Sequence, residues 1–148
     1  QAARAVDGKI VTMIAAALAL GVAMQETGGA VYISNILAVG ATDASPAIVL
    51  SFFFLLVALM SNMLSAKATA VLFTPIAISL ANQVGAPVEA FAVAVIFASN
   101  CGFASPIGYQ TNLMVMGPGH YLFRDFIRAG LPLLIAVWLA FSLAKRRY

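Results

Sequence analysis

The chain has 148 residues, of which 63% are hydrophobic and 9% are charged, and its mean hydropathy is +1.01. Soluble domains carry about 25% charged residues, so this composition predicts a polytopic membrane protein. The net charge of +3 therefore reports on membrane topology and not on nucleic-acid binding. A single cysteine, Cys101, excludes an internal disulfide and most cysteine-ligated metal sites.

The first part of the chain predicts a short membrane span followed by an interfacial helix. Residues 1–9 are polar and charged, with no methionine and no signal peptide, which indicates a piece cut from a longer protein. Residues 10–29 form the first predicted span, although their continuous apolar run is shorter than the roughly 20 residues that a full span needs. Residues 30–39 have apolar side chains at helical spacing, which predicts an amphipathic helix near the interface.

Residues 47–81 predict a re-entrant helical hairpin, after a turn in which Pro46 is placed to start a helix. The apolar runs 47–60 and 68–81 are each too short to cross a membrane. A small polar tip, residues 61–67, joins them. The alternative is one long span bent at the tip. It is disfavoured because the polar side chains of the tip would then lie at the bilayer midplane.

Residues 90–116 predict a broken transmembrane helix. The apolar run 90–98 gives way to the stretch SNCGFASPIGYQTNLMVMGP, residues 99–118, which contains helix-breaking glycine and proline residues. Broken backbone at membrane depth is tolerated only where it is buried in protein or lines a wet cavity. Transporters place such breaks against ions and substrate, so this stretch is the predicted binding region.

The C-terminal part predicts a charged connector, residues 120–128, and a last span, residues 129–144, closed by the basic residues 145–147. If the hairpin enters and leaves on the outer face, the arginines of the connector lie inside, as the positive-inside rule requires. The terminal basic cluster then lies outside and violates that rule. Making the hairpin a true crossing reverses both assignments, so neither of these two arrangements satisfies every charge, and we retain the hairpin.

Two segments carry a resemblance to a known family: SAKATAVLFTPIAISLA and SNCGFASPIGYQTNLMVMGPGHYLFRDFIRAGLPL. They resemble the divalent-anion:sodium symporter family of the ion transporter superfamily, which are citrate-transporter-like permeases. The opening LALGVAMQETGGAVYISNIL is similar to that family's span and interfacial helix, so the resemblance covers nearly the whole chain. It implies an all-α polytopic membrane protein. These residues would form the C-terminal half of an inverted-repeat transporter, with one re-entrant helical hairpin and one broken transmembrane helix.

The resemblance further implies secondary active transport of a small divalent anion, sulfate or a dicarboxylate, by an elevator-type mechanism. The coupling ion would be a sodium ion or a proton, and no other cofactor is expected. A missing N-terminal repeat would supply the other hairpin, the other ion site and half of the substrate site. The full protein is expected to be a homodimer, multi-pass in the inner (plasma) membrane, with the lipid bilayer and a small anion, but no nucleic acid, as partners.

Residue by residue, the resemblance assigns substrate and ion binding to the hairpin tip and the broken helix. The family's tip asparagine, which touches both sodium and the anion, is replaced here by Ala66. No catalytic residue and no metal site beyond a sodium site is implied. Tyr109 and Gln110 are further candidates, either for anion contact or as caps of the broken helix. The assigned residues are Ser65, Lys67, Thr69, Ser99, Asn100, Gly102, Ser105, Pro106, Gly108, Thr111 and Asn112.

Lys67 is the sharpest departure from the family pattern. An ammonium group fixed where a sodium ion would lie could supply the positive charge for the anion without a coupling ion. Placing that charge at the bilayer centre costs about 3 kcal/mol, so Lys67 should face a cavity or a partner. The alternatives are that Lys67 snorkels at an exposed tip, or that the protein is a divergent, poorly active copy.

Some residues also have structural interpretations. Asn62 is expected to hydrogen-bond across the hairpin, and a register slip would let it stand in for the family's tip asparagine. Trp138 lies well inside the last span and is expected to pack against lipid or a neighbouring helix. Asp125 is expected to pair with Arg124 or Arg128.

Other function classes stay open. A sodium/proton or arsenite exchanger of the same superfamily would need membrane-embedded acidic groups, and none of Glu26, Asp43 or Glu89 lies inside an apolar run. The chain could also be an inactive membrane fragment that needs its other half. An enzyme is the weakest candidate, because no paired carboxylates, histidine cluster or nucleophile–base arrangement is visible.

Overall fold

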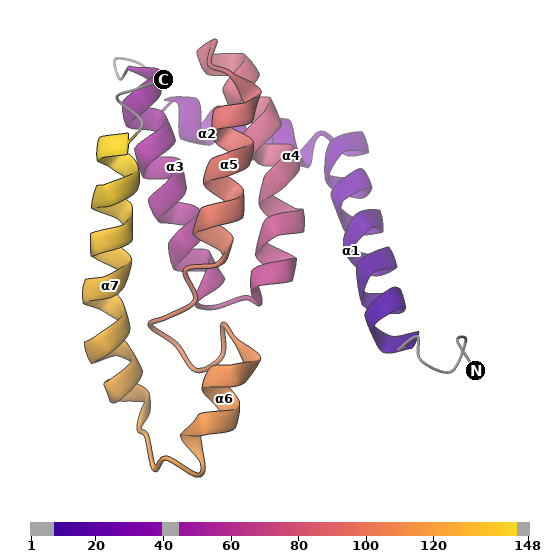
Figure 1. The fold of residues 1–148 in the computed structure, drawn as a ribbon. Helices are drawn as coiled ribbons and strands as arrows, with labels where there is room; N and C mark the ends of the chain where they lie inside the picture. Colours follow the sequence, from indigo (N-terminus) through magenta and orange to yellow (C-terminus); the bar gives the residue numbers. More distant parts are fainter. Residues whose placement is uncertain (1–7, 40–44, 145–148) are drawn as a thin grey trace.

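The computed structural model describes residues 8–39 and 45–144, and within these ranges the chain is all-helical (Figure 1). Most of the predicted N-terminal flank, the loop at 40–44 and the basic cluster at 145–147 lie outside the described residues. The helices are α1 (Gly8–Glu26), α2 (Gly29–Val39), α3 (Pro46–Ser61), α4 (Ala66–Val84), α5 (Val88–Ser99), α6 (Gln110–Met116) and α7 (Phe123–Ala144).

α1 and α2 meet at a tight turn, and α2 then passes behind α4 (Figure 1). Gly28 makes this turn possible because its φ of 72° lies in the left-handed region, which glycine adopts without steric cost. A polar cluster joins α2 to α4: Ser34 Oγ lies 2.9 Å from Ser79 Oγ and accepts from Gln83 Nε2 at 2.7 Å. Within the described residues, α1 packs mainly against α4 and α2. It lies at the side of the molecule in Figure 1, away from α3, α5 and α7.

α3 and α4 run in opposite directions and are joined by residues 62–65 (Figure 1). α3 starts at Pro46, whose fixed φ suits the first helical position, with Ser45 as its N-cap. Ser65 caps α4, because its Oγ accepts from the Ala68 N–H at 3.3 Å. α4 continues to Val84, beyond the predicted end at residue 81, and Gly85 ends it in the left-handed conformation.

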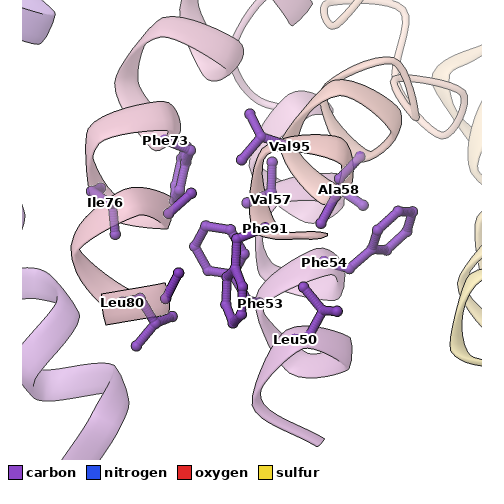
Figure 2. Packing of buried hydrophobic residues seen from close by; sticks show 14 of the residues in the cluster. Leu50, Phe53, Phe54, Val57, Ala58, Phe73, Ile76, Leu80, Phe91 and Val95 are labelled. Carbon is purple, nitrogen blue, oxygen red and sulfur yellow. The ribbon is translucent and has the colours of Figure 1, made fainter. Parts of the chain in front are cut away.

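The core lies where α3, α4 and α5 pack together (Figure 2). Phe53 is at its centre, with its ring centroid 6.3 Å from that of Phe73 and 5.6 Å from that of Phe91. Each ring comes from a different helix, so this cluster fixes the arrangement of all three helices. α5 packs between α3 and α4, and residues on its buried face, such as Phe91 and Val95, are fully or almost fully shielded.

α7 begins at Phe123, so the predicted connector 120–128 is largely helical. Asp125 explains this start, because its Oδ2 accepts from the Leu122 N–H at 2.9 Å and its own N–H donates to the Leu122 carbonyl. An acidic group in the first turn also interacts favourably with the positive end of the helix dipole. The expected ion pair is therefore replaced by a capping role, and the arginines extend the helix.

α7 lies along α3 and is held to it by polar and aromatic contacts. Trp138 Nε1 donates to the Ser51 carbonyl at 3.0 Å, and Ser51 Oγ lies 2.6 Å from Ser142 Oγ. The rings of Phe54 and Phe141 stack with centroids 4.3 Å apart. Among the described residues, α7 is the one helix long and apolar enough to cross a membrane, while α2, α3 and α5 contain shorter apolar segments.

Candidate functional site

The chain leaves helical structure between α5 and α6, over residues 100–109. Asn100 ends α5, and its Nδ2 donates back to the Ile96 carbonyl at 2.8 Å. Pro106 has no N–H to donate to a helical ladder. The result is a stretch of irregular backbone, below α5 in Figure 1, whose polar groups are free to bond elsewhere. We call residues 100–109 the inter-helix loop.

A cavity of about 310 Å³ lies between the inter-helix loop and α6. Three of its lining residues, Asn100, Gly102 and Asn112, are among those predicted from the sequence. Tyr109 was a further candidate, and Phe103 was missed, because a phenylalanine beside small residues gives no signal of a binding role. The lining presents amide, hydroxyl, aromatic and backbone groups and no charged side chain.

Asn112 holds the inter-helix loop from the α6 side. Its Nδ2 donates to the Gly102 carbonyl and to the Ser105 carbonyl, both at 3.1 Å. Both amide hydrogens of Asn112 therefore bond to the loop. The main role of Asn112 in this structure is therefore to hold the inter-helix loop against α6.

Asn62 holds the same loop from the α3 side. Its Nδ2 donates to the Cys101 carbonyl at 3.1 Å and to the Ala58 carbonyl at 2.8 Å, while its Oδ1 accepts from the Ala104 N–H at 2.8 Å. The predicted bond across the hairpin is therefore wrong: Asn62 bonds to α3 and to the loop instead. A lone asparagine at the end of a long apolar run is the signal that could have pointed to this role.

The backbone of the inter-helix loop lies very close to the end of α3 and to α7. A Cβ added at Gly108 would lie 2.5 Å from the Ser61 carbonyl oxygen, and one at Gly102 would lie 3.3 Å from the same atom. A Cβ at Gly130 of α7 would overlap the Phe103 carbonyl. The loop therefore lies against the end of α3 and against α7, and at Gly108 and Gly130 only a glycine allows so close an approach.

The remaining predicted residues of this region have local roles. Ser99 and Ser105 are buried, and their hydroxyls are engaged: Ser99 Oγ donates to the Ile96 carbonyl at 3.2 Å, and Ser105 Oγ accepts from the Ile107 N–H at 3.1 Å. Pro106 is buried within the loop, and Thr111 is exposed on α6. None of these four residues lines the cavity.

The predicted residues of the α3–α4 tip lie in the first turn of α4 and do not line the cavity. Ser65 caps the helix. Lys67 is exposed, with no ion-pair partner among the residues that the structure describes. Thr69 is 0% exposed, and its Oγ1 is the one buried side-chain polar atom without a hydrogen-bond partner in the described ranges. An unpaired buried hydroxyl costs free energy.

Several hydrogen-bond donors of the lining residues have no partner in the described part of the chain. The Gly102 N–H and the Tyr109 hydroxyl have no partner within residues 8–39 and 45–144. Asn100 uses one amide hydrogen on Ile96 and keeps the other. The lining residues therefore keep hydrogen-bonding capacity that a polar ligand could use.

Comparison with known proteins identifies several relatives. The uncharacterized transporter sll0640 of Synechocystis sp. is 40% identical over 136 residues, which are 92% of this chain and 22% of that protein. The probable sodium/sulfate cotransporter 3 of Chlamydomonas reinhardtii is 33% identical over 140 residues, 94% of this chain and 15% of that protein. Sodium/sulfate cotransporter 1 of the same organism is 31% identical over 140 residues, 94% of this chain and 16% of that protein.

The chain thus spans about a fifth or less of the length of these curated relatives. Residues 1–148 also match the citrate transporter family (CitMHS) from end to end. This is a family of membrane transporters and not of enzymes, and the resemblance to citrate-transporter-like permeases is confirmed. The chain belongs to the citrate transporter family.

Proposed function

We propose that the protein carrying this chain is a secondary active transporter of a small divalent anion, sulfate or a dicarboxylate, and that it couples uptake to a cation. The observation that carries the proposal is the cavity of about 310 Å³ beside the inter-helix loop, lined by neutral polar groups. Two relatives named as sodium/sulfate cotransporters support this substrate class. The absence of charged side chains from the lining fits a site that must also release its anion.

The chemistry of the cavity suits an oxyanion. Sulfate and carboxylate groups accept several hydrogen bonds at once, and the donors on offer are the Gly102 N–H, an Asn100 amide hydrogen and the Tyr109 hydroxyl. Hydrogen bonds to a charged acceptor are stronger than those between neutral groups. Neutral donors do not cancel two negative charges, and in this proposal a coupling ion or a side chain outside the lining supplies positive charge.

The first turn of α4 offers both sources of positive charge. The buried, unpartnered Oγ1 of Thr69 is an oxygen ligand of the kind that a sodium ion takes. Lys67, two positions earlier, has no ion-pair partner among the described residues and could act as a tethered cation in place of sodium. We propose that positive charge at this turn, from sodium or from Lys67, balances the bound anion.

In this proposal the chain is the C-terminal repeat of the transporter. α3 and α4 form a re-entrant hairpin whose tip is residues 62–65, and α5, the inter-helix loop and α6 form a broken transmembrane helix. The short lengths of α3 and α5 support this assignment. α2 lies at the interface, an N-terminal repeat completes the site, and a homodimer in the plasma membrane moves the anion by an elevator-type motion.

Uptake by the full-length protein in liposomes tests the proposal. We expect saturable uptake of labelled sulfate or succinate, driven by an inward sodium gradient or, failing that, by a proton gradient, and inhibited by the other anion. Empty liposomes provide the background. If the reconstituted protein takes up neither anion under any gradient, the proposed function is wrong.

The same assay, applied to Lys67 variants, assigns the positive charge. If Lys67 is the tethered cation, uptake is independent of sodium, Lys67→Ala abolishes it, and Lys67→Arg retains it because the charge is kept. If sodium supplies the charge, uptake follows the sodium gradient and survives Lys67→Ala. Thr69→Val, which replaces the free hydroxyl by a methyl group, then weakens the dependence on sodium.

A further inference from the structure

Asn62 uses its whole side-chain amide on backbone groups. One amide hydrogen bonds to the Ala58 carbonyl at 2.8 Å, within α3, and the other to the Cys101 carbonyl at 3.1 Å, in the inter-helix loop. The amide oxygen accepts from the Ala104 N–H at 2.8 Å. The side chain therefore connects the end of α3 to two points of the loop that are far from it in sequence.

The pattern of these three partners fits an asparagine better than other residues of its size. Two carbonyl oxygens require two donors, and one N–H requires an acceptor, which is the inventory of a carboxamide. Aspartate has the same shape, but its ionised carboxylate would face two carbonyl oxygens and could donate to neither. Serine is too short to reach all three groups, so the buried ends of the loop would lose their partners.

The bonded points bracket part of the cavity wall. Gly102 and Phe103, both of which line the cavity, lie between Cys101 and Ala104 in the sequence. Asn112 bonds to Gly102 from the opposite side. The position of these two wall residues is therefore set by a pair of asparagines, Asn62 just after α3 and Asn112 on α6. Of this pair, only Asn112 lines the cavity.

We propose that Asn62 is a positioning residue for the anion cavity: it does not contact the ligand but holds residues 101–104 in the shape that binds it. The proposal rests on the proposed function for its transport readout. Its structural part, that Asn62 holds the loop closed, is independent of the transported substrate. A substitution that removes the two donors and the acceptor of the Asn62 side chain should therefore weaken the affinity for the anion and increase the mobility of residues 101–104.

The decisive variant is Asn62→Asp in the full-length protein, with Asn82→Asp as the matched control. Asn82 is an exposed residue near the other end of α4, so the control makes the same chemical change away from the cavity. In Asn62→Asp we expect the KM for sulfate or succinate to rise by about tenfold or more, the effect of losing a buried hydrogen bond or two. We expect the maximal rate per folded transporter to change much less, and Asn82→Asp to match the wild type.

A second measurement follows the loop itself. Cys101 is 2% exposed, and its Sγ bonds to the Phe97 carbonyl. In a full-length protein in which Cys101 is the sole cysteine, we expect Asn62→Asp to speed the reaction of Cys101 with N-ethylmaleimide by about tenfold or more, because local opening exposes the thiol. Cys101→Ser gives the background, and Asn82→Asp should leave the rate unchanged.

The transport KM and the Cys101 labelling rate together distinguish failure of this inference from failure of the proposed function. Normal KM and normal labelling in a folded Asn62→Asp protein would overturn the inference. A lower maximal rate with an unchanged KM would also overturn it, because that result indicates only fewer folded transporters. If the wild type transports neither anion, the proposed function fails, and the labelling rate alone decides whether Asn62 holds the loop. If Asn62→Asp does not assemble, Asn62→Ser, which adds no charge, carries the same expectations.

Discussion

Single residues set how closely the inter-helix loop can approach the rest of the molecule. Gly108 brings the loop backbone against the Ser61 carbonyl, where an added Cβ would lie at 2.5 Å. The atoms involved are backbone on both sides, and they cannot rotate away as a side-chain end could. By contrast, a Cβ at Gly117, just after α6, would meet nothing within 4 Å. Steric contact therefore requires a glycine at position 108 but not at position 117.

Gly108→Ala should destabilise the full-length transporter by about 1–3 kcal/mol, because the added methyl forces the loop away from α3. We expect a lower unfolding temperature in detergent and a loss of anion uptake. Gly117→Ala, the matched control, should leave both unchanged or slightly raise the stability. An unfolding temperature for Gly108→Ala equal to that of Gly117→Ala would contradict the contact with Ser61.

The sequence was informative about which residues surround the cavity and less so about how they act. Asn100, Gly102 and Asn112 were named from the family resemblance, and the small and polar residues that interrupt an apolar chain pointed to the same stretch. Phe103 could not be named in this way, since its place in the wall depends on the path of the loop. The role of Asn62 also needed the structure, because its partners lie 39 and 42 residues away.

At the scale of elements, α3 and α7 form a pair whose contact combines stacking with hydrogen bonds. Ser51 takes part twice, through its carbonyl to Trp138 and through its hydroxyl to Ser142 at 2.6 Å. Hydroxyl pairs between membrane helices contribute modestly, about 0.6 kcal/mol on average. The ring stack of Phe54 on Phe141 adds dispersion to the same contact.

A double-mutant cycle on Ser51→Ala and Ser142→Ala measures this contact. We expect each single variant to lower the free energy of unfolding and the double variant to lose less than the sum, with a coupling of about 0.5–1.5 kcal/mol. Ser142→Ala combined with Ser79→Ala, which belongs to the separate α2–α4 cluster, should show additive effects. Additive effects in the first cycle would mean that the 2.6 Å contact is not energetically coupled.

Element boundaries followed the sequence where a local signal exists. Pro46 starts α3, and Gly85, past the end of α4, has the left-handed conformation that a glycine permits. The start of α7 did not follow the apolar pattern. The polar residues predict a connector, whereas the Leu122 N–H donates to Asp125 Oδ2 and this cap places Arg124 and Asp125 in the first turn of the helix. A hydropathy pattern alone does not predict a side-chain cap such as the one made by Asp125.

The molecule as a whole leaves much apolar surface uncovered. No residue of α6 is buried, and only Gly130 and Leu134 of α7 are. Met114 of α6 is 75% exposed. A helix of seven residues is unstable on its own in water, and within the described residues α6 gains the two Asn112 hydrogen bonds but buries none of its residues. If the chain is part of a transporter as long as its relatives, as proposed, lipid or the rest of that transporter would stabilise α6.

Amide hydrogen exchange tests this dependence. We expect the amides of α6 to exchange at least about tenfold faster in the isolated 148-residue chain than in the full-length protein, both in the same detergent. The buried face of α5, which packs inside this chain, should show a much smaller difference. Equal exchange of α6 in both proteins would indicate that the helix is stabilised within the chain itself.

The neutral lining of the cavity has a consequence for membrane voltage. Moving one elementary charge through 100 mV is worth about 2.3 kcal/mol. Because none of the residues that line the cavity is charged, the empty lining moves no charge through the electric field in the proposed cycle. Voltage then acts only on what accompanies the lining: the anion's two negative charges, any bound cations and, where it travels with the site, Lys67. The sign and size of the transport current would therefore count the positive charges that travel with each anion.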